Sequence, residues 1–210
     1  MSLSRFFSPL PPALFELEGV WVVGGAVRDA LLLIEGTLQK DGSWEYDLVS
    51  REEDWEKAKE ILTASFGKGY EVKDRFLTTR YTGKNGVLVD ITVAQGSVEE
   101  DLKRRDYSVN ALLWRPPTKG GNGLFDPLSF ASDVLDKRLV PIHHDSLSND
   151  PLRVLRGLRL IATHDLTATP EIWDAFRHES PNLGVTSGER IRHEMAKGFS
   201  ASPSFGRHSG

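Results

Sequence analysis

Residues 21–47 constrain the fold more than any other part of this chain. An apolar run that includes Val22 and Val23 ends in Gly24-Gly25, a helical pattern follows, and a polar loop leads to a second β-rich run. The first run has no helical period, and glycines reach backbone conformations that other residues avoid. This order predicts a strand, a tight turn, a helix, a loop and a second strand.

The turn and the second strand together predict a site for a phosphate and a metal ion. The N–H groups where a helix begins favour anions, and Arg28 lies about one turn into that helix. Glu45 and Asp47 are two apart, so they share one face of a strand. Two adjacent carboxylates repel unless a cation lies between them, and a hard divalent ion takes oxygen ligands. We therefore expect a triphosphate on Gly24 and Gly25, with Mg²⁺ bridging it to both acids. The alternative is a helix beside two solvated acids.

A third acid, Asp90, lies in the apolar run 87–93. Burying an acid without a partner is costly, so it requires a metal ion, an arginine or a strand end. With Glu45 and Asp47 it would complete a two-metal site, as a ligand or as an acceptor of the proton of an incoming 3′-hydroxyl. The alternative is a structural ion pair with a nearby basic group.

Residues 101–114 predict a helix whose charged face passes into an apolar one. Arg105 is held by Asp106 in this interpretation and still donates to a phosphate, because guanidinium has five donors. Asn110 follows one turn later and is positioned to hydrogen-bond a ribose hydroxyl. The alternative is a solvated helix face.

A second cluster of basic residues begins at Asp150. Pro151 after Asp150 is typical of a helix start, with the aspartate as N-cap. Arg153, Arg156 and Arg159 follow at intervals of three, and arginines stacked in this way repel unless they meet anions. Asp150 and Arg153 lie one turn apart and offer an acceptor and a donor to the edge of a base. The alternative is a capped helix with an exposed arginine face.

Composition limits the remaining classes. The chain has 210 residues, no cysteine and a net charge of −4. It therefore has no disulfide or thiolate metal site, which fits a cytoplasmic protein, and an RNA partner needs a local basic patch. No apolar run approaches the ~20 residues of a membrane span. Further expected elements are a helix at 52–66, strands at 70–72, 76–81, 87–93 and 139–142, a hairpin turn at 83–86, and helices from 150, at 171–176 and at 189–199.

These motifs, in this order, resemble those of the class II tRNA nucleotidyltransferase and bacterial poly(A) polymerase family, the CCA-adding enzymes. The similar segments are 24–29 (first signature), 45–47 (metal-binding acids), 104–111 (Arg-Arg-Asp motif), 125–127 (Asp-Pro turn), 149–156 (base-reading motif) and 189–194 (neck motif).

The resemblance implies an α+β fold: a polymerase β-like nucleotidyltransferase head with a mixed β-sheet flanked by helices, followed by an all-helical neck. The implied division is a lead-in (1–19), a head (20–145), a neck (146–200) and a disordered tail (201–210). The implied reaction is Mg²⁺-dependent, template-independent addition of CMP or AMP, from CTP or ATP, to an RNA 3′ end, with tRNA as the expected RNA. Together with the residues argued above, the predicted site residues are Glu45, Asp47 and Asp90 (catalytic), Glu45 and Asp47 (metal), and Gly24, Gly25, Arg28, Arg105, Asp106, Asn110, Asp150, Arg153, Arg156 and Arg159 (nucleotide).

Two alternatives stay open. A catalytically weakened nucleotide- or RNA-binding relative is the second hypothesis, because Glu45 stands where the family pattern has Asp; a purely structural α/β domain is the third. The family also carries helical body and tail segments that hold tRNA. Either the chain belongs to a longer protein, or it works as a homo-oligomer or with a partner chain. Whether C, A, CCA or poly(A) is added does not follow from the sequence.

Overall fold

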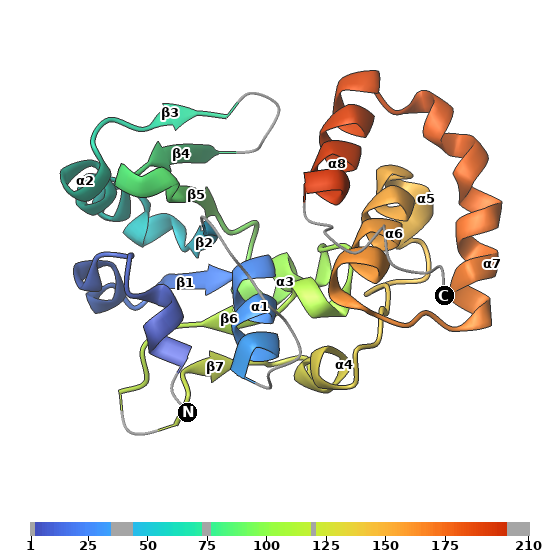
Figure 1. Ribbon diagram of the computed structural model, residues 1–210. Helices are drawn as coiled ribbons and strands as arrows, with labels where there is room; N and C mark the ends of the chain where they lie inside the picture. Colours follow the sequence, from blue (N-terminus) through green and yellow to red (C-terminus); the bar gives the residue numbers. More distant parts are fainter. Residues whose placement is uncertain (1–2, 35–43, 73–76, 119–120, 201–210) are drawn as a thin grey trace, which may run out of the picture.

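The computed structural model describes residues 3–34, 44–72, 77–118 and 121–200. Its strands form one mixed sheet in the order β3-β4-β5-β2-β1-β6-β7 (Figure 1). Within this sheet β2 and β5 run parallel and the other neighbours pair antiparallel. The strands are β1 (Val20–Val23), β2 (Glu45–Ser50), β3 (Tyr70–Glu71), β4 (Thr78–Thr82), β5 (Leu88–Val93), β6 (Leu113–Trp114) and β7 (Leu124–Phe125).

The two faces of the sheet are covered unequally. Helices α1 (Gly25–Ile34) and α2 (Trp55–Phe66) share the larger core with strand residues such as Tyr46 and Leu48. Val49, on the opposite face, belongs to a smaller cluster with residues of α3 (Val98–Lys103). Since side chains alternate along a strand, acids two and four residues before Val49 also point to this less covered face. The sheet therefore leaves room for a site there.

The N-terminal segment is part of the larger core. Its two 3-10 turns, Leu3–Phe7 and Pro12–Glu16, bury apolar side chains against the sheet. The Phe7 ring lies 4.2 Å from that of Trp114, centroid to centroid, and the hydroxyl of Tyr46 donates to the carbonyl of Phe6 at 2.7 Å. Prolines prevent a longer helix here, but the segment still packs.

The expectation of one helix over 101–114 is wrong. Helix α3 ends at Lys103, a 3-10 turn spans Ser108–Asn110, and β6 pairs with β1. Leu112 and Trp114 are buried in the larger core, whereas Leu113 is buried in the smaller one. This alternation is that of a strand with both faces buried, which a short apolar run does not distinguish from a buried helix.

The other expected elements of the head agree with the structure where it describes them. Strands β4 and β5 form the predicted hairpin, and the 3-10 turn Lys84–Gly86 connects them. The segment 139–142 is less regular than expected, because it contributes an isolated bridge between Tyr107 and Pro141 rather than a strand. The disordered tail expected at 201–210 lies outside the described residues.

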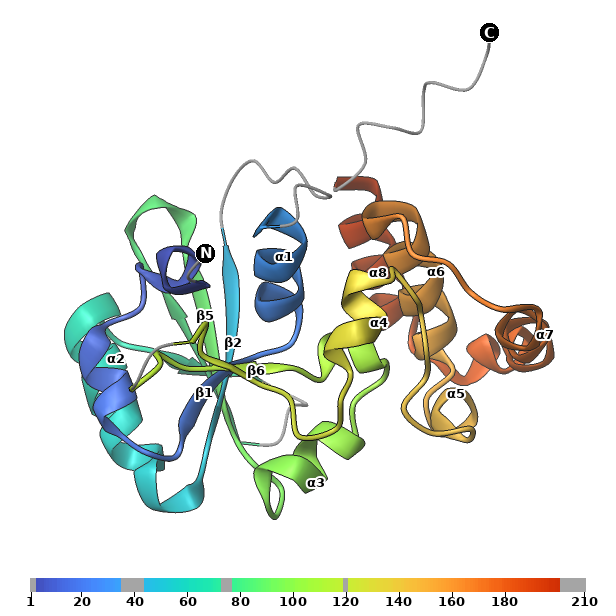
Figure 2. The ribbon, with the colours of Figure 1, turned by 90° about the horizontal axis from the view of Figure 1, so that it is seen from below.

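Helices from Ser146 onward form an all-helical region beside the sheet (Figures 1 and 2). They are α5 (Ser146–Asn149), α6 (Leu152–His164), α7 (Pro170–Glu179) and α8 (Gly188–Ser200), and the short α4 (Ala131–Leu135) precedes them. Figure 2 shows α5–α8 gathered on the side of the molecule away from α2. The expected fold class, a mixed sheet with flanking helices followed by helices alone, is confirmed. Among the described residues no helix has the length and apolar character needed to cross a membrane.

Close packing joins α6 to the sheet region. The buried hydroxyl of Tyr107 donates to the carbonyl of Arg153 at 2.6 Å. A Cβ placed on Gly157 would lie 2.3 Å from that hydroxyl oxygen and 2.6 Å from Cζ of Phe176. Any side chain at this position would overpack the contact, so glycine allows the helix to approach.

Candidate active site

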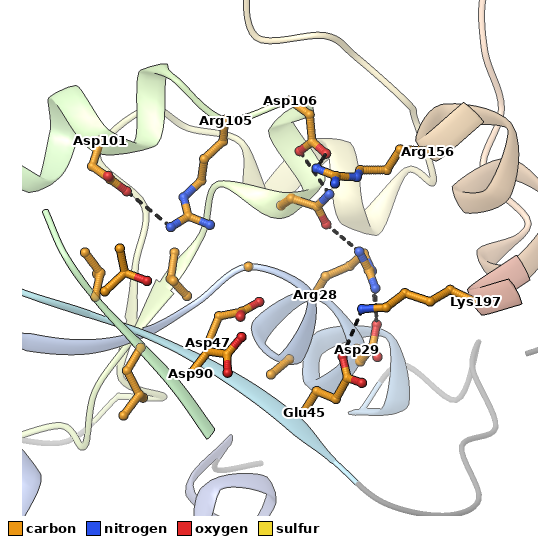
Figure 3. A pocket seen from close by; sticks show the side chains of 18 of the residues that line it. Arg28, Asp29, Glu45, Asp47, Asp90, Asp101, Arg105, Asp106, Arg156 and Lys197 are labelled. Atoms are coloured by element: carbon orange, nitrogen blue, oxygen red, sulfur yellow. Dashed lines mark hydrogen bonds and ion pairs between the residues drawn. The ribbon is translucent and has the colours of Figure 1, made fainter. Parts of the chain in front are cut away.

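A cavity of about 480 Å³ opens between the sheet and the helical region. Its volume is in the range that holds a nucleotide-sized ligand. Figure 3 shows charged side chains converging on it from β2, β5, α1, α3, α6 and α8. The charged residues that line it are Arg28, Arg80, Arg105, Arg156, Arg159, Lys197, Asp29, Glu45, Asp47, Asp90, Asp101, Asp106 and Glu194.

The Gly-Gly turn forms one corner of the cavity. Gly24 has φ +79°, a left-handed conformation that favours glycine, and its N–H donates to the carbonyl of Leu112 at 3.2 Å. A Cβ on Gly24 would lie 3.5 Å from Nη1 of Arg105 and 3.8 Å from Oδ2 of Asp47. Helix α1 begins at the next residue, Gly25. The turn is thus placed between a guanidinium and a carboxylate.

We expect Gly24→Ala to destabilise the protein by about 1–2 kcal/mol, because an L-residue in a left-handed conformation is strained by roughly that amount. Nucleotide affinity should fall as well if the turn moves. Urea unfolding and calorimetry with CTP measure both effects. Gly184→Ala is the matched control: it has no heavy atom within 4 Å of the added Cβ and no positive φ. Equal effects of the two substitutions would contradict the prediction.

The predicted acids lie on the face of the sheet that forms the cavity floor. Asp47 and Asp90 are register partners on the parallel strands β2 and β5, so their side chains are neighbours (Figure 3). Glu45 lies two residues before Asp47 and accepts a hydrogen bond from Nζ of Lys197, on α8, at 3.2 Å. Both oxygens of Asp90 accept hydrogen bonds at 2.6 Å from Arg80 on β4. The alternative considered for Asp90, an ion pair with a basic neighbour, is therefore present; its role at a metal stays a prediction.

The donor set suits a hard cation by its chemistry, since Glu45, Asp47 and Asp90 offer only carboxylate oxygens. Within the described residues, however, no three acidic or histidine side chains converge closely enough to form a ready-made metal site. Lys197 and Arg80 instead neutralise two of these acids. A metal ion held here would be bound by these three carboxylates and would exchange with the two bound cations.

A buried network of charges connects the sheet region to the helices. Asp106 accepts hydrogen bonds from the N–H of Tyr107 at 2.8 Å, from Nδ2 of Asn110 at 3.1 Å and from Nη1 of Arg156 at 3.1 Å. Burial opposes its ionisation, but the charge of Arg156 and these hydrogen bonds hold the pKa of Asp106 below its ordinary value. Asp106 is therefore an ionised anchor that orients Asn110 and Arg156.

The network continues through Glu194 of α8, which is 4% exposed. One carboxylate oxygen lies 2.6 Å from Nε of Arg159 and the other 3.5 Å from Nε of Arg156. Burial disfavours the charge of Arg156, but Asp106 and Glu194 raise its pKa above the ordinary value. Of the three arginines expected to meet anions, Arg156 and Arg159 contact protein carboxylates, whereas Arg153 donates to backbone carbonyls and a serine hydroxyl.

Arg28 and Arg105 also have carboxylate partners. The buried Arg28 side chain donates to Asp29 and to Oδ1 of Asn110, and Arg105 donates from Nη2 to Asp101 at 3.2 Å. Each of the cavity's lining cations thus contacts an acid. A polyanionic ligand would have to compete with these partners or use their remaining N–H groups.

The structure does not bring Asp150 and Arg153 to the cavity lining. Asp150 accepts from Arg190 at 2.8 Å and from the N–H of Leu152 at 3.3 Å. Pro151, rather than the predicted Asp150, occupies the N-cap position of α6, so the helix begins one residue later than expected. Arg153 donates to the carbonyls of Arg104 and Arg105 at 2.9 and 3.3 Å, and so connects α6 to the end of α3. Their predicted role at the base stays a prediction, and it requires these contacts to be exchanged.

Sequence reasoning missed several lining residues, of which Arg80, Lys197 and Asp101 are the clearest. Asp101 and Arg105 are four apart, a spacing that indicates an ion pair within a helix. Arg80 and Lys197 had no such local signal, because their partners are 10 and 152 residues away.

Comparison with known proteins agrees with this geometry. The sheet, its turn and the two neighbouring acids define a nucleotidyltransferase head. The family model "Poly A polymerase head domain" matches residues 20–140, and the chain belongs to this family. The resemblance drawn from the motifs is thereby confirmed.

Relatives with assigned names cover most of this chain. It is 33% identical over 180 residues to a CC-adding tRNA nucleotidyltransferase of Thermus thermophilus (83% of this chain, 38% of the relative). It is 30% identical over 192 residues to an A-adding tRNA nucleotidyltransferase of Deinococcus radiodurans (89% and 41%). A solved CCA-adding enzyme in complex with ATP superimposes with a TM-score of 0.72 at 26% identity (94% of this chain, 50% of that one). The chain spans less than half the length of these two curated relatives.

Proposed function

We propose that this chain is the head and neck (20–145 and 146–200) of a template-independent RNA nucleotidyltransferase. It transfers CMP or AMP from CTP or ATP to an RNA 3′ end, with tRNA as the acceptor, Mg²⁺ as the metal and the cytoplasm as the compartment. The observation that carries the proposal is the meeting of Gly24, Asp47, Asp90 and Arg105 in one cavity. The family assignment and the names of the relatives support it.

Each part of the cavity has a role in this reaction. The helix start at Gly25 offers backbone N–H groups to the triphosphate, while the N–H of Gly24 stays bound to Leu112, and Arg105 offers a guanidinium beside the turn. Glu45, Asp47 and Asp90 would hold Mg²⁺. When bound, that ion lowers the pKa of an attacking hydroxyl and stabilises the leaving pyrophosphate. Asp106 and Glu194 orient Arg156 and Arg159 toward the nucleotide. These groups act chiefly by position and charge, which is how phosphoryl transfer is catalysed.

The alternative, a nucleotide- or RNA-binding relative with weakened catalysis, rests on the contact between Glu45 and Lys197. Glutamate carries its carboxylate one methylene further out than aspartate, where it reaches α8. If this pair persists, nucleotide binding will not depend on Mg²⁺.

Calorimetry and an extension assay test the proposal. We expect CTP or ATP to bind more tightly with Mg²⁺ than with EDTA, because the ion offsets repulsion between the triphosphate and the three acids. We also expect labelled CTP or ATP to extend a tRNA that lacks its 3′ end. UTP and GTP are the controls for base selection. Nucleotide binding that ignores Mg²⁺, with no extension, would favour the alternative. Failure of all four nucleotides to bind the folded protein would overturn the proposal.

A further inference from the structure

His164 lies at the end of α6 in contact with the first helix of the sheet region. Its side chain is 9% exposed. Nε2 lies 2.9 Å from Nη2 of Arg28 and 3.1 Å from Oδ1 of Asp29, although 136 and 135 residues separate these positions. No motif of the sequence drew attention to this histidine. It connects the helical region to the helix that follows the Gly-Gly turn.

The neighbouring hydroxyl determines which ring nitrogen carries the proton. Thr163 Oγ1 donates its single hydrogen to the carbonyl of Arg159 at 2.8 Å. The same oxygen lies 2.7 Å from Nδ1 of His164, so it accepts there and Nδ1 is the donor. In a neutral imidazole Nε2 then carries a lone pair, which faces the Nη2 group of Arg28.

The surroundings keep the imidazole neutral. Burial lowers the pKa of His164, and the positive charges of Arg28 and Arg159 lower it further; the charge of Asp29, and the hydrogen bond that a protonated ring would donate to it, oppose them. The net pKa shift is downward from an ordinary value of about 6.5, so the lone pair is present at neutral pH.

With this arrangement Arg28 is held on several sides. Nε and Nη2 donate to Oδ1 of Asp29 at 3.0 and 2.7 Å, Nη1 donates to Oδ1 of Asn110, and Nη2 donates a second hydrogen to His164. Contacts with described residues account for four of its five N–H donors. A Cβ on Gly25 would lie 3.3 Å from Nη2 of Arg28, so the guanidinium lies against the turn. One Nη1 hydrogen has no partner among the described residues and is placed to reach a ligand.

We propose that His164 is a positioning residue of this site: its Nε2 accepts a hydrogen bond from Arg28, and this bond holds the guanidinium against the Gly-Gly turn and fixes the helical region to α1. The consequence for nucleotide binding rests on the proposed function, whereas the hydrogen-bonding state of the ring does not. The ligand class is the phosphate chain of a nucleoside triphosphate.

Three substitutions of His164 distinguish the effect of losing the acceptor atom from the effect of changing the side-chain volume. The amide oxygen of glutamine can occupy the place of Nε2, asparagine reaches only the place of Nδ1, and leucine has no acceptor. We expect His164→Gln to bind CTP and ATP nearly as the wild type does, and His164→Asn and His164→Leu to bind them about tenfold more weakly, as for loss of a hydrogen bond to a charged group. His178→Gln, at an exposed histidine of α7, is the control.

The pH dependence of nucleotide affinity tests the role of the Nε2 acceptor, because a side chain that acted only by packing would not change it. Protonation would place an imidazolium against Arg28 and remove the acceptor, so wild-type affinity should decline as the pH falls below about 6.5. Unfolding stability should decline over the same window, since the unfolded histidine binds the proton more readily. His164→Gln should lack this component of both profiles. Long-range ¹H–¹⁵N spectra of the wild type at neutral pH should show His164 protonated at Nδ1 and unprotonated at Nε2.

The outcomes are distinguishable. Nδ1 protonation together with rescue by glutamine alone supports the proposal. Equal affinity in all three variants and the wild type overturns it, and so does a ring protonated at Nε2. If the wild type binds no nucleotide, the proposed function fails, while the spectra still decide the state of the ring.

Discussion

Replacing Asp47 by asparagine should reduce nucleotidyl transfer by at least about 10³-fold and remove the Mg²⁺-dependent part of nucleotide binding. A catalytic metal ion contributes several kcal/mol to the transition state, and each 1.36 kcal/mol corresponds to a factor of ten. Asp47 is the acid placed both beside Gly24 and in register with Asp90. Its carboxylate is therefore the one that a metal ion and the triphosphate would share.

The same variant should keep its fold. Asp47 is exposed in the cavity, and removing one charge from a group of acids changes the free energy of unfolding by less than about 1 kcal/mol. Asp174→Asn on the surface of α7 is the matched control, since that acid is 75% exposed and far from the cavity lining. Undiminished transfer in Asp47→Asn, or unchanged Mg²⁺ dependence of binding, would show that the site is misplaced.

Glu194→Gln should have the largest effect on stability. Its carboxylate is the shared partner of Arg156 and Arg159, and it is almost fully buried. Loss of the charge leaves two guanidinium groups facing each other with Asp106 as the remaining buried acid of the network. We expect a loss of about 3 kcal/mol, the lower end of the range for removing one partner of a buried ion pair, because the amide oxygen still accepts one hydrogen bond.

Urea unfolding and thermal melting measure this loss, which corresponds to a decrease of roughly 6–12 °C in Tm for a chain of this size. Glu189→Gln is the control because it removes the same charge from an exposed position of the same helix. If Glu194→Gln and Glu189→Gln have the same Tm, the buried network does not stabilise the packing of α8 on α6.

The strand, turn, helix and strand of residues 21–47 were predictable because their sequence signals are local. The β-rich run before Gly24, the glycine pair and the alternation of Glu45 and Asp47 each depend on residues a few positions apart. The hairpin between β4 and β5 was predictable for the same reason. Local conformational preference and the true structure agree at these points.

Strand β6 was missed because its pairing is not local. Leu113 and Trp114 are apolar enough for a helix, and pairing with β1, about 90 residues earlier, and with β7 makes them a strand. The roles of Arg80 and Lys197 were hidden similarly, because an ion pair across strands or helices has no signature in spacing. Asp150 and Arg153 lie near the start of α6, but the structure gives them partners outside the cavity.

The sequence by itself determined the order of most elements, the fold class, the family and the identity of most charged groups in the cavity, because periodicity, turn residues and motif spacing are properties of short segments. Only the tertiary structure decided which acid faces which cation, as for Asp90 with Arg80 and Glu45 with Lys197, and which histidine contacts Arg28. The physical reason is that charge interactions depend on distance in space and on burial, and the folded backbone sets both for residues up to 152 positions apart.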